Sequence, residues 1–460
     1  MLVPLCQTLK FGSIRSTRHL GSGWGGYKVL HSIDRRKWGT TSLSVSPNNY
    51  FNFTPLLASA CRWDIGISVQ HFSPRVIPYQ AWCDRIGNKM LECMLATPVS
   101  FSSSSQTIVD EKECSQFSCN TPFSLQYDKL VIAVGHILKV TFGIPGVKEH
   151  AHFLKDVKDA RAIRARVLQC FEQTHQPVVT DADLWKLLNF CIVGGGPTGV
   201  ELAAELHDLI NEDLRTYYPE LARLAQINLY DVAPSILGSF DHDLVKYAFS
   251  RDIPKTGFTA KKINIWTNHH VERVESNKLF LKEKGEVPFG VLVWSTGLAT
   301  NPLIESITGV KKHPKTGSLI TDHHLNIIES DDSPNPDVWA IGDAAIIEDN
   351  HLPATAQVAY QKGAYLARKL NGIARGRQHP EEFQFYNKGM LAYIGNWNAI
   401  YGRPKDSDGG KFFIGSPESG RAAWLLWRSA YFTLTLSWKK QVRYCSPVIS
   451  GIFGRDISCF

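Results

Sequence analysis

Residues 189–206 read NFCIVGGGPTGVELAAEL, and this stretch predicts the fold more directly than any other part of the chain. Residues 191–193 form a short apolar strand, and Gly194, Gly196 and Gly199 follow it with the spacing G-x-G-x-x-G. The first glycine permits a tight turn, the second lets a phosphate approach the backbone, and the third lets the next helix pack closely on the strand. We therefore predict a strand, a phosphate-binding turn and a helix N-terminus that together bind a dinucleotide.

An acidic residue ends the next predicted strand, which covers residues 227–230. Asp231 is placed to hold the ribose hydroxyls of the adenosine, and its charge would repel a 2′-phosphate, which favours NADH over NADPH. Asp231 lies further from the glycines than the roughly 20 residues of the usual fingerprint. A helix and loop over residues 211–225 account for the difference.

The same glycine spacing occurs near the N-terminus, at Gly21, Gly23 and Gly26. Its flanks are less typical, because residues 13–20 read SIRSTRHL and carry charged side chains where a buried strand has aliphatic ones. The strand predicted after it, residues 40–45, ends at Ser46, whose hydroxyl bonds a ribose more weakly than an acid does. Taken alone, this motif fits a dinucleotide site and a glycine-rich surface loop equally well.

A third element, residues 338–345, reads VWAIGDAA and places a carboxylate at the end of a strand. There Asp343, after Gly342, could accept hydrogen bonds from the ribityl hydroxyls of a flavin, although Gly-Asp is also a common turn dipeptide. Apolar runs that end at Gly135 and Gly297 are typical of strands buried on both faces of a parallel sheet. Helical patterns over residues 154–168 and 200–214 lie between them, so we predict an α/β fold.

Composition narrows the class of protein. The chain has 460 residues and a net charge of +7, which is too little basicity for a nucleic-acid-binding protein. Its ten cysteines include no Cys-x-x-Cys pair. Adjacent histidines at 269–270 and 323–324 would point to opposite faces of a strand, so we predict no metal site.

Two segments bear on location. Residues 1–33 are basic and contain no acidic side chain, which is typical of a transit peptide, although a short basic start without function is equally possible. No uncharged apolar stretch of about 18 residues occurs, so a membrane-spanning helix is not predicted.

Near the C-terminus, helical spacing aligns an aromatic face flanked by basic residues, and the face consists of Trp424, Trp427, Tyr431, Leu434 and Trp438. This pattern suits a helix lying in a membrane surface, although an aromatic stripe taken alone more often marks a core helix or a dimer face.

Several of these segments together resemble one family. They are GSGWGGY, SPNNYFNFTPLL, YDKLVIAVG, FGIPGVKEHAHFLKDVKDARAIR, GGGPTGVELAAELHD, VPFGVLVWSTGLATNPL, DVWAIGDAA, PATAQVAYQKGAYLA, LAYIGNWNAI and AWLLWRSAYFTLTLSWKK. In this order they resemble the type II, or alternative, NADH:ubiquinone oxidoreductases. The resemblance is greatest to the fungal mitochondrial enzymes that oxidise NADH on the outer face of the inner membrane, and it covers nearly the whole chain.

The resemblance implies two Rossmann-like dinucleotide-binding domains and a C-terminal amphipathic helical segment that anchors the protein at the membrane surface. An FAD-binding domain would comprise residues 19–159 and 296–375, an NADH-binding domain residues 160–295, and the membrane-association segment residues 376–460. NADH would pass a hydride to FAD, and the flavin would pass two electrons to ubiquinone without pumping protons. The missing Cys-x-x-Cys separates this reading from the disulfide reductases, which need a redox-active cysteine pair.

The resemblance also assigns site residues and partners. FAD would be held by Gly21, Gly23, Gly26, Ser46, Gly135, Gly342 and Asp343. NADH would be held by Gly194, Gly196, Gly199, Glu201, Asp231 and Gly297. Ubiquinone would meet Gln357, Gln361 and Tyr431. The protein would be a homodimer, peripheral on the mitochondrial inner membrane, and no side chain would act as a nucleophile.

The chain departs from the family pattern over residues 61–121, where the apolar periodicity is irregular. Together with the polar first strand, this predicts weakened FAD binding. Two further hypotheses therefore stay open: a divergent relative, or the product of a mistaken gene model, that lacks activity, and an NAD(P)H-dependent flavin reductase that does not use quinone.

Overall fold

The computed structural model describes residues 17–21, 23–34, 43–46, 50–52, 54, 57–62, 69–71, 77–87, 90–95, 122–137, 141–238, 240, 245, 263–377, 381–402 and 419–426. The chain forms two compact units, each assembled from separate stretches of sequence. The first unit contains Met1–Asn52, Val69–Ile137 and Leu298–Tyr386. The second contains Phe53–Ser68, Leu138–Gly297 and Asn387–Phe460.

A ten-stranded sheet forms the first unit. In spatial order its strands are β20 (Ala345–Ile347), β17 (Leu319–Thr321), β18 (Asn326–Ile328), β19 (Pro334–Ala340), β8 (Lys129–Ile132), β1 (Thr17–Leu20), β2 (Leu43–Ser46), β5 (Ile77–Gly87), β6 (Met90–Leu95) and β7 (Pro122–Gln126). The five strands from β19 to β5 run parallel. This unit also contains the short pair β3 (Tyr50–Asn52) and β4 (Val69–His71).

The polar first strand lies in the middle of this sheet. β1 pairs in parallel with β2 on one side and with β8 on the other, and His19 and Leu20 are buried. Its neighbour β8 supplies Leu130, Val131 and Ile132, all fully buried. Hydrogen bonding to two flanking strands thus overrides the weak strand propensity that residues 13–20 show by themselves.

The irregular segment after residue 61 also contributes strands. β5 is eleven residues long and continues the parallel order next to β2, and β6 and β7 then pair antiparallel beyond it. The irregular apolar pattern therefore does not prevent these residues from extending the sheet. Pairing with neighbouring strands can stabilise a strand whose own apolar pattern is irregular.

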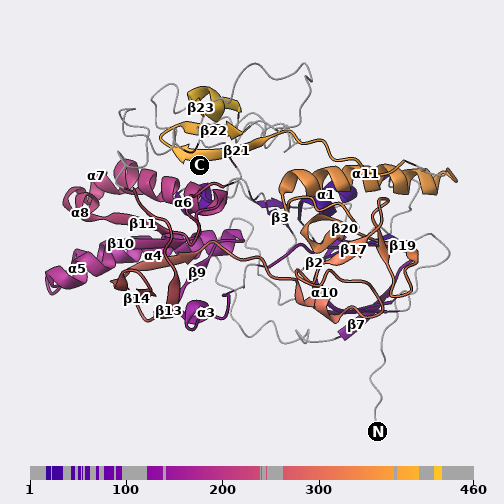
Figure 1. Ribbon diagram of the computed structural model, residues 1–460, viewed down its shortest axis with the longest axis horizontal. Coiled ribbons are helices and arrows are strands. Elements are labelled where there is room, and N and C mark those ends of the chain that lie inside the picture. The colour runs from indigo at the N-terminus through magenta and orange to yellow at the C-terminus, as the bar shows by residue number, and fades with distance from the viewer. Residues whose placement is uncertain are drawn as a thin grey trace, which may run out of the picture. The chain divides into compact units, whose positions relative to one another are not determined.

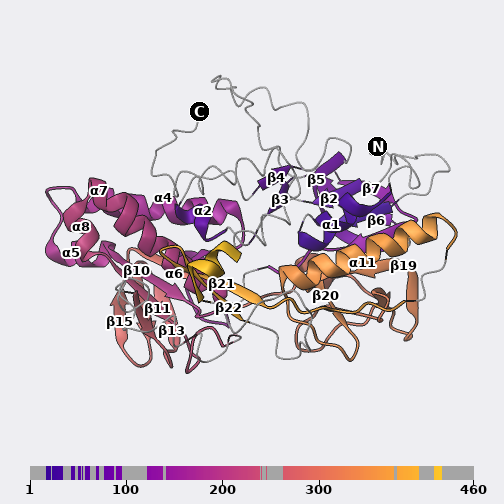
Figure 2. The same cartoon turned by 90° about the horizontal axis from the view of Figure 1, so that it is seen from above.

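Two helices of the first unit pack against each other, α1 (Trp24–Ser32) and α11 (Ala356–Ala374) (Figures 1 and 2). The contact is close because a Cβ added to Gly363 would lie 2.7 Å from the carbonyl oxygen of Gly25. A core of Val29, Trp339, Leu366 and neighbouring apolar residues fills the space between these helices and the sheet. The unit is completed by α10 (Pro302–Ser306) and the short 3₁₀ helix η5 (Gly342–Ala344).

A second parallel sheet forms the centre of the second unit. Its order is β12 (Ile263–Trp266), β11 (Gln226–Tyr230), β10 (Asn189–Val193), β16 (Val291–Trp294) and β9 (His152–Phe153). All its neighbouring strands are parallel, and β16 is buried along its whole length. An antiparallel sheet of β13 (Val271–Glu275), β14 (Lys278–Leu281) and β15 (Gly285–Pro288) belongs to the same unit.

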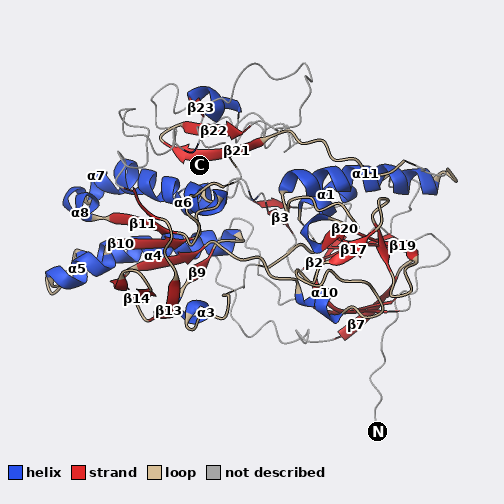
Figure 3. Ribbon diagram, in the orientation of Figure 1, coloured by secondary structure: helices blue, strands red, loops and turns tan. Residues whose placement is uncertain are grey.

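Helices accompany the strands of the second unit (Figure 3). They are α2 (Ser59–Arg62), α3 (Val147–His150), α4 (Val157–Thr174), α5 (Asp181–Leu187), α6 (Pro197–Asp208), the π-helix η4 (Leu209–Leu214), α7 (Arg215–Tyr217) and α8 (Pro219–Leu224). A capping box of Asp156 and Asp159 starts α4: the Asp156 side chain accepts backbone N–H groups of the first turn, and the Asp159 side chain accepts the backbone N–H of Asp156. The predicted α/β fold with two Rossmann-like sheets is confirmed.

The C-terminal part belongs to the second unit. A three-stranded sheet of β21 (Met390–Gly395), β22 (Asn398–Gly402) and β23 (Ser419–Gly420) packs through β21 on α6 (Figure 1). Residues 421–426 are helical, and the rest of the predicted aromatic face lies outside the described residues. Within the described ranges, every helix is too short or too polar to cross a membrane.

The limits of the compact units differ from the expected domain limits. Residues 141–159, expected in the FAD-binding domain, belong to the second unit, because β9 adds to its sheet beside β16. Residues 387–460, expected as a separate membrane segment, also belong to this unit.

Candidate functional site

The glycine turn of the second unit connects β10 to α6. Gly194 has φ of 116°, a conformation that favours glycine, and a Cβ on Gly199 would lie 2.0 Å from the carbonyl oxygen of Gly194. Gly196 is the N-cap of α6, and a Cβ added to it would meet nothing within 4 Å. The turn therefore leaves open space beside the helix N-terminus, where backbone N–H groups can bind a phosphate.

Asp231 closes this turn from the end of β11. Its carboxylate accepts the N–H of Gly195 and, at 2.7 Å, the N–H of Ala233. Leu237 N–H donates to the carbonyl of Gly195 at 2.8 Å and holds the turn from the same loop. The predicted ribose-binding acid thus also fixes the turn that is predicted to bind the pyrophosphate.

The end of β16 supports the turn from the other side. Ser295 Oγ donates to the carbonyl oxygens of Val193 and Gly194, at 3.0 and 3.1 Å. Gly297, two residues later, has φ of 81°. Ser295 carries no signal in the sequence, because serine before a glycine-containing loop is common.

Glu201 lies one turn into α6. It is partly buried, and its Oε1 accepts the backbone N–H of Tyr393 from β21 at 3.3 Å. Burial raises the pKa of Glu201 to about 8, so the carboxyl group holds its proton at neutral pH. This places Glu201 between the glycine turn and the C-terminal sheet.

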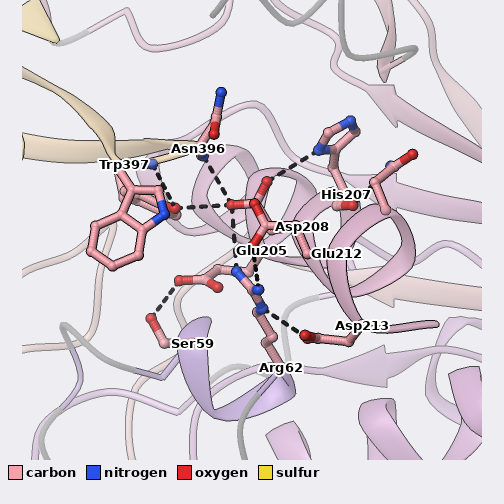
Figure 4. Close-up of polar contacts among 12 residues, drawn as sticks. Ser59, Arg62, Glu205, His207, Asp208, Glu212, Asp213, Asn396 and Trp397 are labelled. Atoms are coloured by element: carbon pink, nitrogen blue, oxygen red, sulfur yellow. Dashed lines mark hydrogen bonds and ion pairs between the residues drawn. The ribbon is translucent and has the colours of Figure 1, made fainter. Parts of the chain in front are cut away.

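A buried cluster of charges sits at the other end of α6 (Figure 4). Asp208 is 1% exposed, and its Oδ2 accepts Tyr393 Oη at 2.9 Å and the N–H of Asn396 at 3.0 Å. Arg62, from α2, lies 3.8 Å from the same oxygen. The cluster therefore joins α2, α6 and the C-terminal hairpin.

The π-helix η4 adds two further carboxylates to Arg62. Its guanidinium donates to Glu212 at 2.6 Å and to Asp213 at 2.9 Å. Ser59, also on α2, donates to Glu205 at 2.5 Å. The wider turn of η4 directly after Asp208 accompanies a site where consecutive acidic residues face one arginine.

The glycine turn of the first unit has the same design. Gly21 has φ of 96°, and a Cβ on Gly26 would lie 2.3 Å from the carbonyl oxygen of Gly21. Gly23 is the N-cap of α1, and its nearest neighbour for an added Cβ is Ala133 O at 4.0 Å. Gly135, after β8, has φ of 66° with open space around it. The motif therefore forms a strand–turn–helix connection rather than a surface loop.

Ser46 and Asp343 end strands of the same sheet. Ser46 is the last residue of β2 and is buried, and Asp343 lies in η5 directly after β19. Gly342 has φ of 72°, and a Cβ added to it would lie 3.6 Å from Ala359 of α11. The carboxyl ends of parallel strands are where ligands bind in sheets of this kind.

The predicted quinone residues are placed unequally. Gln357 and Gln361 both lie on α11, with Gln361 Nε2 3.5 Å from Gln357 Oε1. The Gln361 amide donates to Tyr386 O at 2.8 Å and accepts Tyr386 N–H at 3.0 Å. Gln361 thus anchors the chain after α11 with both ends of its amide. Tyr431 lies outside the described residues.

Residues 20–363 match the pyridine nucleotide-disulphide oxidoreductase family, and residues 387–456 match the NDH2 C-terminal domain. A relative from Dictyostelium discoideum named probable NADH dehydrogenase is 34% identical over 445 residues, which cover 96% of this chain and 90% of the relative. The chain belongs to the type II NADH dehydrogenase family.

Mitochondrial members of the family match at similar identity. An internal alternative NAD(P)H-ubiquinone oxidoreductase of Solanum tuberosum is 33% identical, with 95% of this chain and 87% of the relative covered. The external alternative NADH-ubiquinone oxidoreductase of Yarrowia lipolytica is 31% identical, with 95% and 80% covered. A solved structure of NDH2 from Plasmodium falciparum in complex with NADH has a TM-score of 0.79 and 25% identity, and 97% of this chain and all of that chain are covered.

One expectation for the C-terminal segment of this type II NADH dehydrogenase needs correction. The helical spacing predicts Trp424 on a membrane-facing aromatic stripe, but Trp424 is buried, with its ring centroid 4.8 Å from that of Trp397. Its neighbour Leu425 is 54% exposed. Trp424 is therefore a core residue, which agrees with the alternative reading for this position.

Sequence reasoning missed the residues that act across long separations. Arg62 and Asp208 are 146 positions apart, and although Asp208 ends the segment GGGPTGVELAAELHD, nothing in the sequence connects it with Arg62. Lys362 was missed because it sits in a helix that reads as amphipathic, yet it is 2% exposed. A buried arginine or lysine has no local signature in a single sequence.

Proposed function

We propose that this chain is a non-proton-pumping NADH:quinone oxidoreductase that binds FAD, oxidises NADH and reduces ubiquinone. Two glycine turns carry the proposal. Each begins with a glycine at positive φ, and each has an N-cap glycine, Gly196 or Gly23, that leaves space for a phosphate. The names of the Dictyostelium, potato and Yarrowia relatives, and the NADH in complex with the Plasmodium NDH2, support the same activity.

The residues of the first unit fit FAD. The N–H groups at the start of α1, beside Gly23, would bind the FAD pyrophosphate, and Ser46 would bond its ribose. Asp343, directly after Gly342 in η5, would accept hydrogen bonds from the ribityl chain, and Gly135 would be a further FAD-binding residue. When bound, FAD supplies the two-electron chemistry that accepts a hydride from NADH and passes electrons to quinone.

The residues of the second unit would orient NADH. Backbone N–H groups at Gly196 and Gly199 would bind its pyrophosphate, and Asp231 would bind the ribose hydroxyls and repel a 2′-phosphate. Glu201 and Gly297 flank the same turn. Ubiquinone would meet Gln357 on α11, with Tyr431 and Gln361 as the further quinone residues of the proposal.

Location and assembly form part of the proposal. The mitochondrial names of the relatives support a mitochondrial location, and the family resemblance adds peripheral attachment to the inner membrane. Relatives named internal and external match at 33% and 31% identity, so these names favour neither face of the membrane over the other. The family resemblance supports a homodimer, for which sedimentation in detergent is the measurement.

The visible spectrum of the full chain in detergent tests the activity. We expect flavin absorption near one per chain, bleached by NADH and restored by a short-chain quinone. Folded but colourless protein would favour the divergent, inactive relative. Bleaching by NADH or NADPH that ferricyanide restores and quinone does not would favour the quinone-independent flavin reductase.

Two glycine variants serve as each other's controls. In Gly196→Ala the new methyl meets no protein atom within 4 Å, so the fold is kept, but it occupies the proposed phosphate space of NADH. We expect NADH to bind about tenfold or more weakly, the loss of one hydrogen bond to a charged group, with FAD affinity unchanged. Gly23→Ala should weaken FAD binding and leave NADH affinity unchanged. If either variant weakened NADH and FAD binding equally, the assignment of the Gly196 turn to NADH and the Gly23 turn to FAD would be wrong.

A further inference from the structure

A buried ammonium group lies in the first unit, next to the proposed FAD site. Lys362 is on α11, is 2% exposed, and donates from Nζ to the carbonyl oxygen of Ala345 at 3.3 Å. Within the described residues, no carboxylate lies within ion-pair distance of this Nζ. The three N–H donors of the ammonium thus share one neutral acceptor, the carbonyl oxygen of Ala345. Burying a charge with so few hydrogen-bond partners costs free energy.

The helix that carries Lys362 touches both parts of the proposed FAD site. Ala359, one turn earlier, packs against Gly342, and Gly363, the next residue, packs against Gly25 in the glycine turn. The Lys362 side chain extends towards the start of β20, because it reaches Ala345, two residues after Asp343. The buried ammonium therefore contacts the chain two residues after Asp343, close to the Gly342–Asp343 turn.

The charges around Lys362 leave Asp343 as its electrostatic partner. Burial lowers the pKa of Lys362 to about 8, and the charge of Asp343 opposes this shift. Lys28, on the packed helix α1, faces the Tyr360 ring at 4.6 Å from its centroid. Asp343 is the carboxylate expected to contact the flavin. The charge of Lys362 would therefore affect the cofactor through Asp343.

We propose that Lys362 is a positioning residue for FAD: its buried ammonium attracts the Asp343 carboxylate across the Gly342–Asp343 turn and offsets the negative charge of Asp343 at the proposed flavin site. This rests on the proposed FAD site. Without the ammonium, Asp343 would bind the ribityl hydroxyls less well. Its uncompensated charge would also disfavour adding electrons to the flavin and make the flavin midpoint potential more negative.

A set of four full-length proteins in detergent tests the role: wild type, Lys362→Met, Lys362→Arg and Asp343→Asn. FAD is titrated into flavin-depleted protein and followed by flavin fluorescence. We expect Lys362→Met to weaken FAD binding about tenfold, the scale of one charge-assisted interaction. Lys362→Arg should recover part of this loss. The midpoint potential should move to more negative values in Lys362→Met and much less in Lys362→Arg.

A double variant separates positioning from packing. If Lys362 acts through Asp343, Lys362→Met should change FAD affinity little when Asp343 is already Asn. Equal losses in both backgrounds, or a midpoint potential unchanged in Lys362→Met, would overturn the proposal. Lys362→Gln replaces Lys362→Met if the latter does not fold, as judged by circular dichroism. If wild type binds no FAD, the proposed function fails, whereas normal FAD binding without any effect of Lys362→Met removes only this role.

Discussion

The backbone N–H of Gly195 donates to the carboxylate of Asp231, so the acid at the end of β11 binds the glycine turn itself. The second carboxylate oxygen accepts Ala233 N–H. These two hydrogen bonds hold the Asp231 carboxylate in place in the protein without any ligand. Asp231 would then organise the NADH site and also exclude a 2′-phosphate.

We expect Asp231→Asn to reduce NADH affinity and to narrow the preference for NADH over NADPH. The amide keeps the shape of the side chain but loses the charge, and a hydrogen bond to a charged group contributes about 1.5–3 kcal/mol. The ratio of the NADPH and NADH dissociation constants measures this. A ratio unchanged from wild type would show that Asp231 does not select the cofactor.

Removing the arginine from the Asp208 cluster should destabilise the second unit. Arg62→Met removes the buried guanidinium that lies 3.8 Å from Asp208 and donates to Glu212 and Asp213, and breaking a buried pair costs about 3–5 kcal/mol. Arg223 is the matched control, because it is 62% exposed and its ion-pair partner Glu220 is 76% exposed, so Arg223→Met should cost less than about 0.5 kcal/mol. Chemical denaturation of both variants gives the two losses in the free energy of unfolding. Similar denaturation midpoints for the two variants would show that Arg62 does not stabilise the second unit through the Asp208 cluster.

The raised pKa of Glu201 predicts a pH dependence of stability. Between its ordinary value of 4.5 and about 8, the folded protein holds a proton here that the unfolded chain has released. The native state binds more protons in this window, so stability falls as pH rises through it. Glu201→Gln keeps an oxygen for Tyr393 N–H and removes the ionisation.

The melting temperature of Glu201→Gln relative to wild type should therefore increase from pH 5 to pH 8.5. Glu220→Gln, on an exposed helix surface, is the control and should show no such trend. A constant difference between Glu201→Gln and wild type across the range would mean that Glu201 ionises normally.

The buried position of Trp424 separates folding from membrane binding. Trp424→Ala removes a side chain packed on Trp397 and should destabilise the second unit by about 3 kcal/mol or more. Leu425→Ala, one residue later and 54% exposed, should change stability by about 0.5 kcal/mol or less. Thermal unfolding measures both, and vesicle sedimentation shows which of the two affects membrane binding. A stable Trp424→Ala variant would return this residue to the membrane-facing stripe.

Sequence reasoning was strongest where backbone geometry limits the residue type. The turns at Gly21 and Gly194 need positive φ and close backbone contacts, which only glycine allows, and both turns form where their spacing predicts them. It was weakest at β1 and at residues 77–126. There strand formation depends on neighbouring strands rather than on the alternation of apolar residues within the segment.

The two strand–turn–helix units and the family could be predicted from the amino-acid order alone, because they follow from local spacing and the succession of motifs. The partner of each side chain became apparent only in the folded chain. Asp231 contacts the backbone of Gly195, Gln361 the backbone of Tyr386, and Asp208 the side chain of Arg62. Such contacts join residues far apart in the chain. Their partners are selected by how strands and helices pack, which no short stretch of sequence specifies. The same packing buries Lys362 against the backbone of Ala345, two residues after Asp343.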